Sequence, residues 1–238
     1  PETYTERNSS AASDVYKRQA CVFYMLERSL ILDMSNRIED ILYFWFGAFP
    51  TPYSADVSKS DMWFVNGADY DSEIFINFGV DYDRAVNGEL DEWVYSYRGR
   101  LALIILLDQF SRHIHRGSVD AFSQDERAQA LCIDGLGAGD DSRLHAVERS
   151  FFYLPLMHAE DIGTQELSMK AYAQLVQDVP EQYRKPFEMN LAFAAKHHYL
   201  IERFGRFPEL NALLDRESTE EELAFLSDDA AWAEYSFL

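Results

Sequence analysis

The chain has 238 residues, and its 41 acidic and 21 basic side chains give a formal net charge of −20 at pH 7. Hydrophobic residues make up 47% of it and aromatic residues 15%, which is enough to bury a core and excludes a disordered chain. The excess of acids argues against nucleic acid or an anionic membrane surface as a partner, and no apolar run is long enough to cross a bilayer.

The N-terminal 33 residues read as a tail that is separate from the folded protein. Residues 14–19 (DVYKRQ) look like the in-frame translation of a sequencing adaptor, so we expect residues 1–33 to be non-native or disordered. Met34 is then the expected natural start. Residues 34–238 are expected to form a single domain.

Helical periodicity runs through nearly all of the remaining sequence. Apolar side chains recur every three or four residues, and Gly47 and Gly205 stand where helices are expected to stop. Thr219 and Glu222 form a capping box that predicts the start of a last helix. In chain order, we predict the earlier helices over residues 36–46, 69–85, 90–97, 101–107, 124–136, 142–153, 159–177 and 181–204.

Two connecting segments and two helix caps complete this outline. Residues 49–59 contain two prolines and are predicted to be a loop, and residues 111–119 are predicted to be a second one. Ser123 and Asp141 are the expected N-caps of the helices that follow them, because their side-chain oxygens can accept from free backbone N–H groups.

Residues 101–107 (LALIILL) form the most apolar segment of the chain. Taken alone, this run fits a buried strand as well as a buried helix. No alternating strands occur elsewhere to pair with it, so we predict a buried helix and an all-α fold. We find no convincing internal repeat in the sequence.

The two cysteines, Cys21 and Cys132, lie far apart and match neither a disulfide framework nor a zinc-binding spacing. This usage is typical of a reducing compartment, so we expect a cytoplasmic protein. The sequence also lacks the glycine-rich phosphate-binding loops and the serine-hydrolase motif, and no cofactor is expected.

Positive charge is concentrated in two short segments. Residues 98–116 contain four arginines and the single acid Asp108, while residues 196–206 contain three basic residues and Glu202. Arginine suits bidentate binding of carboxylate or phosphate, so these segments suggest a site for an anion. The alternative is that the arginines pair with the many carboxylates of the chain as structural ion pairs.

Two groups of residues are candidates for acid–base chemistry. Asp108 directly follows the apolar run, so its carboxylate needs a partner, and Arg112 lies one helical turn later. Asp108 is therefore either a base or ligand in a pocket or one half of a salt bridge. His158 precedes Glu160 and Asp161 where a helix begins, and these acids either orient the imidazole or complement the helix dipole.

The other histidines form no recognisable metal motif. His197 and His198 are adjacent, so on a helix their side chains diverge by about 100° and only one of them can face a given pocket. His113 and His115 lie in the second predicted loop. A mixed histidine–carboxylate metal site has no motif support, and we expect none.

Five blocks of the sequence together resemble one bacterial family. They are ILYFWFG at 41–47, LALIILLDQFSRHIHRG at 101–117, ERSFFYLPLMHAED at 148–161, RFGRFP at 203–208 and RESTEEE at 216–222. The family is catalogued as domain of unknown function 924, and the resemblance covers residues 38–226. It implies an all-helical single domain that resembles the tetratricopeptide-like superhelix, and it implies no known activity.

The resemblance also implies which polar positions are characteristic of the family. In this sequence they are Asp108, Gln109, Arg112, Arg116, Gly117, Glu148, Arg149, Tyr153, His158, Glu160, Asp161, His197, Arg203, Arg206 and Asn211. The chain departs from the family pattern at Ser111, His113, His115, Ala159, Glu209 and Leu210. His113 and His115 are therefore not expected to carry a family-wide function. The family usually has His-Arg in place of Glu209 and Leu210, so this chain lacks a cation at one end of the expected site.

Three functional interpretations follow, and whether the protein is an enzyme stays open. In the first, a polar pocket binds a small carboxylate or phosphate; His158 or His197 moves a proton, and Asp108 or Glu160 orients it. The ligand-binding residues would be Gln109, Arg112, Arg116, Glu148, Arg149, Tyr153, Asp161, Arg203 and Arg206. In the second, a tetratricopeptide-like scaffold binds a protein or peptide partner. In the third, the polar blocks are ion-pair networks that tie helix ends together.

Overall fold

The structure is a computed structural model in which residues 36–228 are described. The chain divides into two compact units, Pro1–Asp40 and Ile41–Leu238, and the described part of the first is helical over residues 36–40. The predicted tail and its adaptor-like segment lie outside the described residues. Within residues 36–228 there is no β-strand, which confirms the predicted all-α fold.

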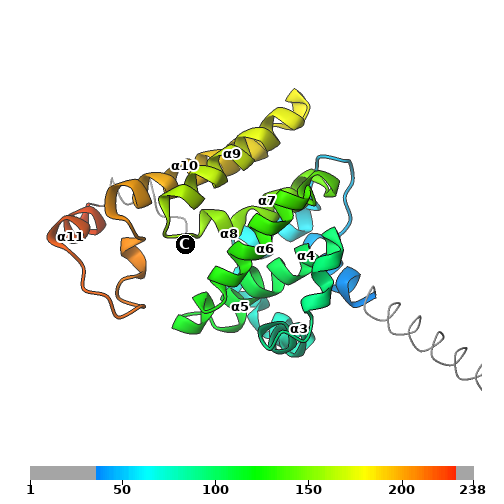
Figure 1. Cartoon of the computed structure of the whole chain (residues 1–238), viewed down its shortest axis with the longest axis horizontal. Coiled ribbons are helices and arrows are strands. Elements are labelled where there is room, and N and C mark those ends of the chain that lie inside the picture. The colour runs from blue at the N-terminus through cyan, green and yellow to red at the C-terminus, as the bar shows by residue number, and fades with distance from the viewer. Residues whose placement is uncertain (1–35, 229–238) are drawn as a thin grey trace, which may run out of the picture. The chain divides into compact units, whose positions relative to one another are not determined.

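Residues 41–228, the described part of the second unit, are mostly helical (Figure 1). This part begins with helical residues 41–46, as predicted, and these bury Ile41, Leu42, Trp45 and Phe46. The α-helices that follow are α2 (Ser60–Phe64), α3 (Asp71–Val86), α4 (Tyr97–Ile104), α5 (Ser111–Ile114), α6 (Asp125–Ala138), α7 (Ala146–Phe152), α8 (Leu154–Met157), α9 (Ile162–Asp178), α10 (Lys185–Phe204) and α11 (Glu220–Ser227).

The apolar run over residues 101–107 is a buried helix, as predicted. Each of its seven side chains is at most 1% exposed. The run begins in α4 and continues without a break into η4 (Ile105–Phe110), which has the wider hydrogen-bonding pattern of a π-helix. Burying a large aliphatic side chain contributes roughly 1.5–3 kcal/mol, so this segment is a main source of the stability of the fold.

Aromatic rings pack around the end of this run. The ring of Phe110 lies 5.1 Å from that of Phe78 on α3 and 5.6 Å from that of Trp45, centroid to centroid. Trp45 in turn makes an edge-on contact with Phe151 on α7, at 5.7 Å. These contacts hold the π-helix between α3, α7 and the first helical segment of the second unit.

The helices α9 and α10 are the two longest in the described part of the chain and pack side by side (Figure 1). Gly205 ends α10 in the left-handed conformation, with φ of +70°, as the sequence predicts. The chain then leads to α11. Two residues of α10, Leu200 and Ile201, form an apolar cluster with Phe207 and with Phe225 on α11. This cluster holds α11 against the end of α10.

Several predicted helix boundaries are wrong. Residues 111–114 are helical rather than loop, because the chain runs directly from the π-helix into α5. Ser123 does not cap α6; Gln124 occupies the N-cap position, and the helix begins at Asp125.

The start of α7 was also predicted wrongly. His145, not Asp141, caps this helix, since its ring nitrogen accepts from Val147 N–H while Glu148 accepts from His145 N–H. Histidine is not among the residues that usually cap helices, so the sequence did not indicate this N-cap. The capping box predicted at the start of α11 is confirmed.

Short 3₁₀-helices occupy parts of four predicted α-helices and three segments outside them, and α9 begins later than predicted. The 3₁₀ segments are Val57–Lys59, Gly67–Tyr70, Asp91–Tyr95, Val119–Phe122, Asp141–Arg143, Glu181–Tyr183 and Pro208–Leu210. Asp161 caps α9, so this helix starts at Ile162. Pro186 stands in the first turn of α10, where its missing N–H is tolerated, and this helix starts at Lys185.

No helix within residues 36–228 combines the length and the apolar character that a membrane crossing requires. Likeness to the tetratricopeptide-like superhelix and cytoplasmic location both stay predictions.

Candidate functional site

Asp108 is the centre of a hydrogen-bonded polar group next to the core. Its side chain is 0% exposed, because the apolar run that precedes it carries the chain into the interior. One carboxylate oxygen, Oδ1, accepts from His158 Nδ1 at 2.8 Å and lies 3.1 Å from Arg112 Nη1. The other, Oδ2, accepts from Gln109 Nε2 at 2.6 Å. A buried carboxylate is stable only with such partners.

The π-helix explains how Asp108 comes to face these partners. A π turn inserts one extra residue per turn, so it rotates the following side chains and changes which backbone carbonyls are bonded. Arg112 Nη1 donates to the carbonyl oxygen of Asp108 at 2.7 Å. The same guanidinium therefore binds both the backbone and the side chain of Asp108. Single π turns are frequent at functional sites, so Ile105–Phe110 is a candidate functional segment.

Arg112 also joins the group to α6. Its guanidinium makes a bidentate pair with Asp125, at 3.0 and 3.1 Å, and lies 5.4 Å from the ring centre of Phe122. Although burial opposes ionisation, Arg112 and His158 hold the pKa of Asp108 well below its usual range. Burial raises the pKa of Asp125 despite the same arginine. We call Asp108, Gln109, Arg112, Asp125 and His158 the Asp108 cluster.

His158 combines the buried partner Asp108 with a partly exposed side chain, as Arg112 does at 22% exposure. It directly follows α8, a short helix that contacts α6, α9 and α10, and its side chain is 20% exposed. Because Asp108 is ionised and can only accept, His158 Nδ1 carries the hydrogen of their 2.8 Å bond. In the neutral ring, Nε2 is then the atom that can take up a proton.

His197, on α10, lies beside His158, with 6.4 Å between the ring centroids. Its Nδ1 donates to the carbonyl oxygen of Phe193 at 2.9 Å, and its ring packs edge-on against Phe207 at 5.4 Å. Burial lowers the pKa of His197 to about 4, so it is neutral at pH 7. His197 therefore places a neutral polar ring beside His158.

Gln165 on α9 holds the backbone on both sides of His158. Its Nε2 donates to the carbonyl oxygens of Met157 and Ala159, at 2.6 and 2.8 Å, and the residue is 0% exposed. Met157 is the last residue of α8 and Ala159 lies just beyond it, where a helix leaves its last carbonyl acceptors unpaired. We did not predict Gln165; a polar residue on the buried face of an amphipathic helix is the signal that could have found it.

We predict that Gln165→Leu unfolds more easily than the wild type by about 1–3 kcal/mol, since it leaves buried carbonyls without donors. It should also weaken the bond from His158 to Asp108, seen as a change in the imidazole ¹⁵N shifts of His158. Ser168→Ala is the matched control, because Ser168 is equally buried on α9 and its hydroxyl has no hydrogen-bond partner within residues 36–228. If Gln165→Leu left the His158 shifts as they are, the positioning role would be wrong.

Glu160 and Asp161 lie close to His158 in sequence but have other partners. Glu160 accepts from Phe207 N–H at 2.7 Å and makes a bidentate pair with Arg216, at 2.6 and 3.0 Å. It thus attaches the segment after α10 to the start of α9. Asp161 accepts from Thr164 N–H and serves as the N-cap. Neither carboxylate bonds to the His158 ring.

The arginines predicted at both ends of the site pair with carboxylates elsewhere. Arg116 makes a bidentate pair with Asp71, at 2.6 and 2.8 Å. Arg203 binds Glu221 at 3.0 Å, and Arg206 binds Glu222 at 2.6 and 2.7 Å. The last two pairs link the end of α10 to α11. The structure therefore brings only Arg112, of these four arginines, next to Asp108.

Arg149 and Tyr153 belong to a separate network. Arg149 Nε donates to the Tyr153 hydroxyl at 3.0 Å, and that hydroxyl donates to Asp141 at 2.6 Å. Arg149 also pairs with Asp178 at 2.8 Å. Burial and the bond to Asp141 raise the pKa of Tyr153 above its usual range. This network joins α7 to the end of α9.

Glu148 forms another pair, with Arg98 at 3.0 Å, and closes the capping box of α7. Of the predicted site residues, Asp108, Gln109, Arg112 and His158 thus share one hydrogen-bonded group with His197 beside it. The other predicted residues bind partners in separate clusters. Within the described residues, no group of three histidine, cysteine or acidic side chains is placed to hold a metal ion.

Comparisons with known proteins agree with this all-helical architecture. The model of a family described as bacterial protein of unknown function (DUF924) matches residues 41–230. The solved structure of ATU0120, a protein of unknown function from Agrobacterium tumefaciens, is similar at 32% sequence identity and a TM-score of 0.68, over 82% of this chain and 98% of that one. No curated protein matches the chain. The family match spans most of the sequence, and the chain belongs to the bacterial DUF924 family.

Proposed function

We propose that this protein binds a small, anionic molecule next to His158 and transfers a proton to or from it. The observation that carries the proposal is the 2.8 Å bond between His158 Nδ1 and the fully buried Asp108 carboxylate. An ionised carboxylate behind Nδ1 selects one tautomer and stabilises the imidazolium, which leaves Nε2 as the proton-transferring atom. His197 would contact the same molecule.

Electrostatics favour an anion at Nε2 only when His158 is protonated. The charge of Arg112 is already matched by Asp108 and Asp125, which it binds at 3.1 and 3.0 Å. The positive charge that a carboxylate or phosphate could meet is therefore that of the imidazolium itself. Binding of such an anion would therefore be coupled to uptake of a proton at Nε2.

The test is a screen of small carboxylates and phosphates by thermal shift, followed by NMR of the imidazole nitrogens. We expect one chemical class to raise the melting temperature and to move the Nε2 signal of His158. His158→Gln should abolish the rise in melting temperature, while His115→Gln, which changes a histidine outside the Asp108 cluster, should keep both effects. Where a hit is turned over, His158→Gln should lower the rate by about 10²–10⁴.

Two results would contradict the proposal. One is a hit that binds His158→Gln as tightly as the wild type. The other is a screen in which no anion stabilises the protein while a pull-down recovers a stoichiometric protein partner, which would favour a scaffold role instead.

A further inference from the structure

Arg143 differs from the other arginines in the described part of the chain. Its guanidinium stacks over the ring of Tyr97, with 4.1 Å from the guanidinium carbon to the ring centroid, and binds no carboxylate or carbonyl oxygen within residues 36–228. Most other arginines there pair with an acid, as expected for a chain with 41 acids and 21 bases. Stacking on an aromatic face leaves the edge of a guanidinium free to donate to a planar anion.

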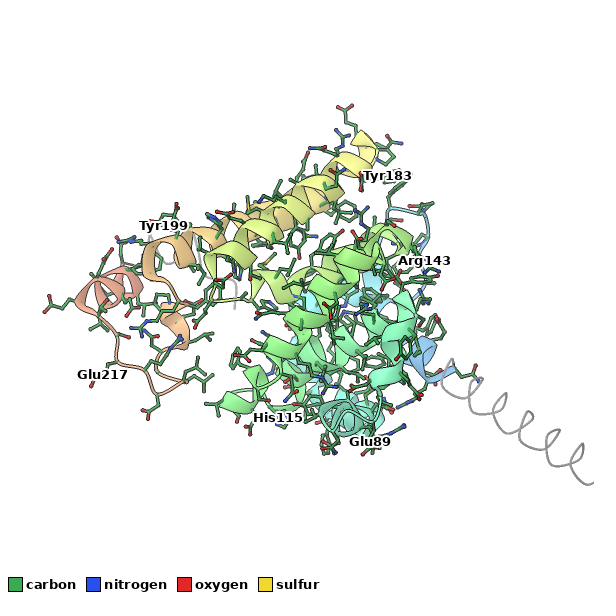
Figure 2. The ribbon with its side chains drawn as sticks, viewed as in Figure 1. Glu89, His115, Arg143, Tyr183, Tyr199 and Glu217 are labelled. Atoms are coloured by element: carbon green, nitrogen blue, oxygen red, sulfur yellow. The ribbon has the colours of Figure 1, made fainter. Side chains whose placement is uncertain are left out.

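Arg143 lines a pocket of about 510 Å³. The walls come from segments far apart in the sequence, namely residues 52–53, residues 142–146 together with Arg149, and residues 178–179. Ligand pockets in proteins typically measure about 300–1,000 Å³, so the volume suits a small organic molecule. Figure 2 shows Arg143 and Tyr183 on the same side of the second unit.

The pocket combines positive charge with an apolar and aromatic wall. Arg149 is held in place by Tyr153 and Asp178, which it binds at 3.0 and 2.8 Å, and it adds a second guanidinium. Tyr53 stacks on Tyr183 with 5.6 Å between the ring centroids. The apolar part of the lining is Pro52, Leu144, Ala146 and Val179.

We propose that this pocket binds a small aromatic monocarboxylate, with the carboxylate on Arg143 and the ring against Tyr53. Arg149 is already matched by Asp178 and Asp141, at 2.8 and 3.8 Å, so the positive charge left for a ligand is that of Arg143, which balances one negative charge and not two. An inorganic phosphate would leave the apolar wall unused and would bring more charge than the pocket can match.

This site is independent of the proposed function at His158. It shares no residue with the Asp108 cluster, and its lining lies on the loop before α2, on η6 (Asp141–Arg143) and the start of α7, and at the end of α9. Failure of one proposal therefore leaves the other intact.

The experiment is an NMR titration of the full chain with benzoate, with benzyl alcohol, which has the same ring and no charge, and with inorganic phosphate. We expect benzoate to bind at millimolar or lower concentration and to shift the backbone signals of residues 142–146. Arg143→Gln should weaken benzoate binding about tenfold or more, because it removes a charged hydrogen-bond pair. Tyr53→Leu should also weaken it.

Arg84→Gln is the matched control, because it makes the same change in net charge at an exposed arginine on α3. Its affinity for benzoate should stay within about twofold of the wild type. The proposal is overturned if benzoate does not bind, if Arg143→Gln binds it as the wild type does, or if phosphate or benzyl alcohol binds equally well.

Discussion

Replacing Asp108 with Asn is expected to destabilise the protein by about 3–5 kcal/mol, the usual effect of removing one partner from a buried ion pair. The carboxylate is 0% exposed and accepts from His158, Gln109 and Arg112. An amide has the same shape, but its NH₂ group must face one of these donors. Arg112 would keep only Asp125 as a charged partner. Urea unfolding of the two proteins measures the difference.

The same substitution should change the chemistry of His158. In the variant, Nδ1–H faces either a neutral amide oxygen or the amide NH₂, so its hydrogen bond should weaken and the neutral ring should shift toward the Nε2–H tautomer that free histidine prefers. The ¹⁵N shifts of the two ring nitrogens report both changes. Asp134→Asn is the control for charge, since Asp134 is exposed on α6. A variant with normal stability and an unchanged His158 tautomer would show that Asp108 has neither role.

Acid should act on this pair in a defined direction. The pKa of Asp108 is lower in the folded protein than in the unfolded chain, so its contribution to stability is present above about pH 4 and declines as the pH falls below that value. The wild type should therefore lose more stability than Asp108→Asn on acidification. A larger loss in the wild type would show that the ionised pair, and not only the packing of these side chains, contributes to stability.

The sequence was sufficient for features that depend on neighbouring residues. The apolar run over 101–107, the stop at Gly205 and the capping box at Thr219 are local patterns, and the structure has each of them. The contact of Asp108 with Arg112 is also local, because the two residues are four apart. Helix type was not predicted, since no local pattern in the sequence indicated that the run continues as a π-helix over Ile105–Phe110.

Long-range partners could not be derived from the sequence. His158 and Asp108 are 50 positions apart, and nothing in their spacing indicates that the end of α8 lies beside the π-helix. The sequence shows the arginines in groups, but many carboxylates are available to each one, so its partner could not be predicted. Arg116 bonds to Asp71, 45 residues away, while Arg206 bonds to Glu222, 16 residues away. A surplus of acids makes the presence of ion pairs predictable and their identity unpredictable.

The second large effect is expected at Glu222 on α11. This carboxylate is 2% exposed and accepts from Arg206 at 2.6 and 2.7 Å, from Asn211 at 3.2 Å and from Thr219 N–H at 2.7 Å. Glu222→Gln should destabilise the protein by about 2–3 kcal/mol, because a neutral amide gives up the charged pair and turns donors toward Arg206 or Asn211. The melting temperature and urea unfolding measure the loss.

The pH dependence identifies the cause of that loss. The bonds from Arg206, opposed only by burial, lower the pKa of Glu222 to about 2, against 4.5 for an unperturbed glutamate. A lowered folded-state pKa means that the stabilisation is complete above about pH 4.5 and disappears as the pH falls toward 2. The gap in stability between wild type and Glu222→Gln should therefore be constant near neutral pH and close in acid.

Glu221→Gln provides the matched control on the same helix, since Glu221 is exposed and pairs with Arg203 at the surface. Surface pairs contribute about 0–1 kcal/mol, so this variant should unfold nearly as the wild type does. Because Glu222 links Arg206, Asn211 and Thr219, its loss should free α11 from the end of α10 before the core around residues 101–107 unfolds. Hydrogen exchange should then rise first in α11, and equal exchange there in both variants would mean that the apolar cluster at Phe207 and Phe225 holds this helix without the carboxylate.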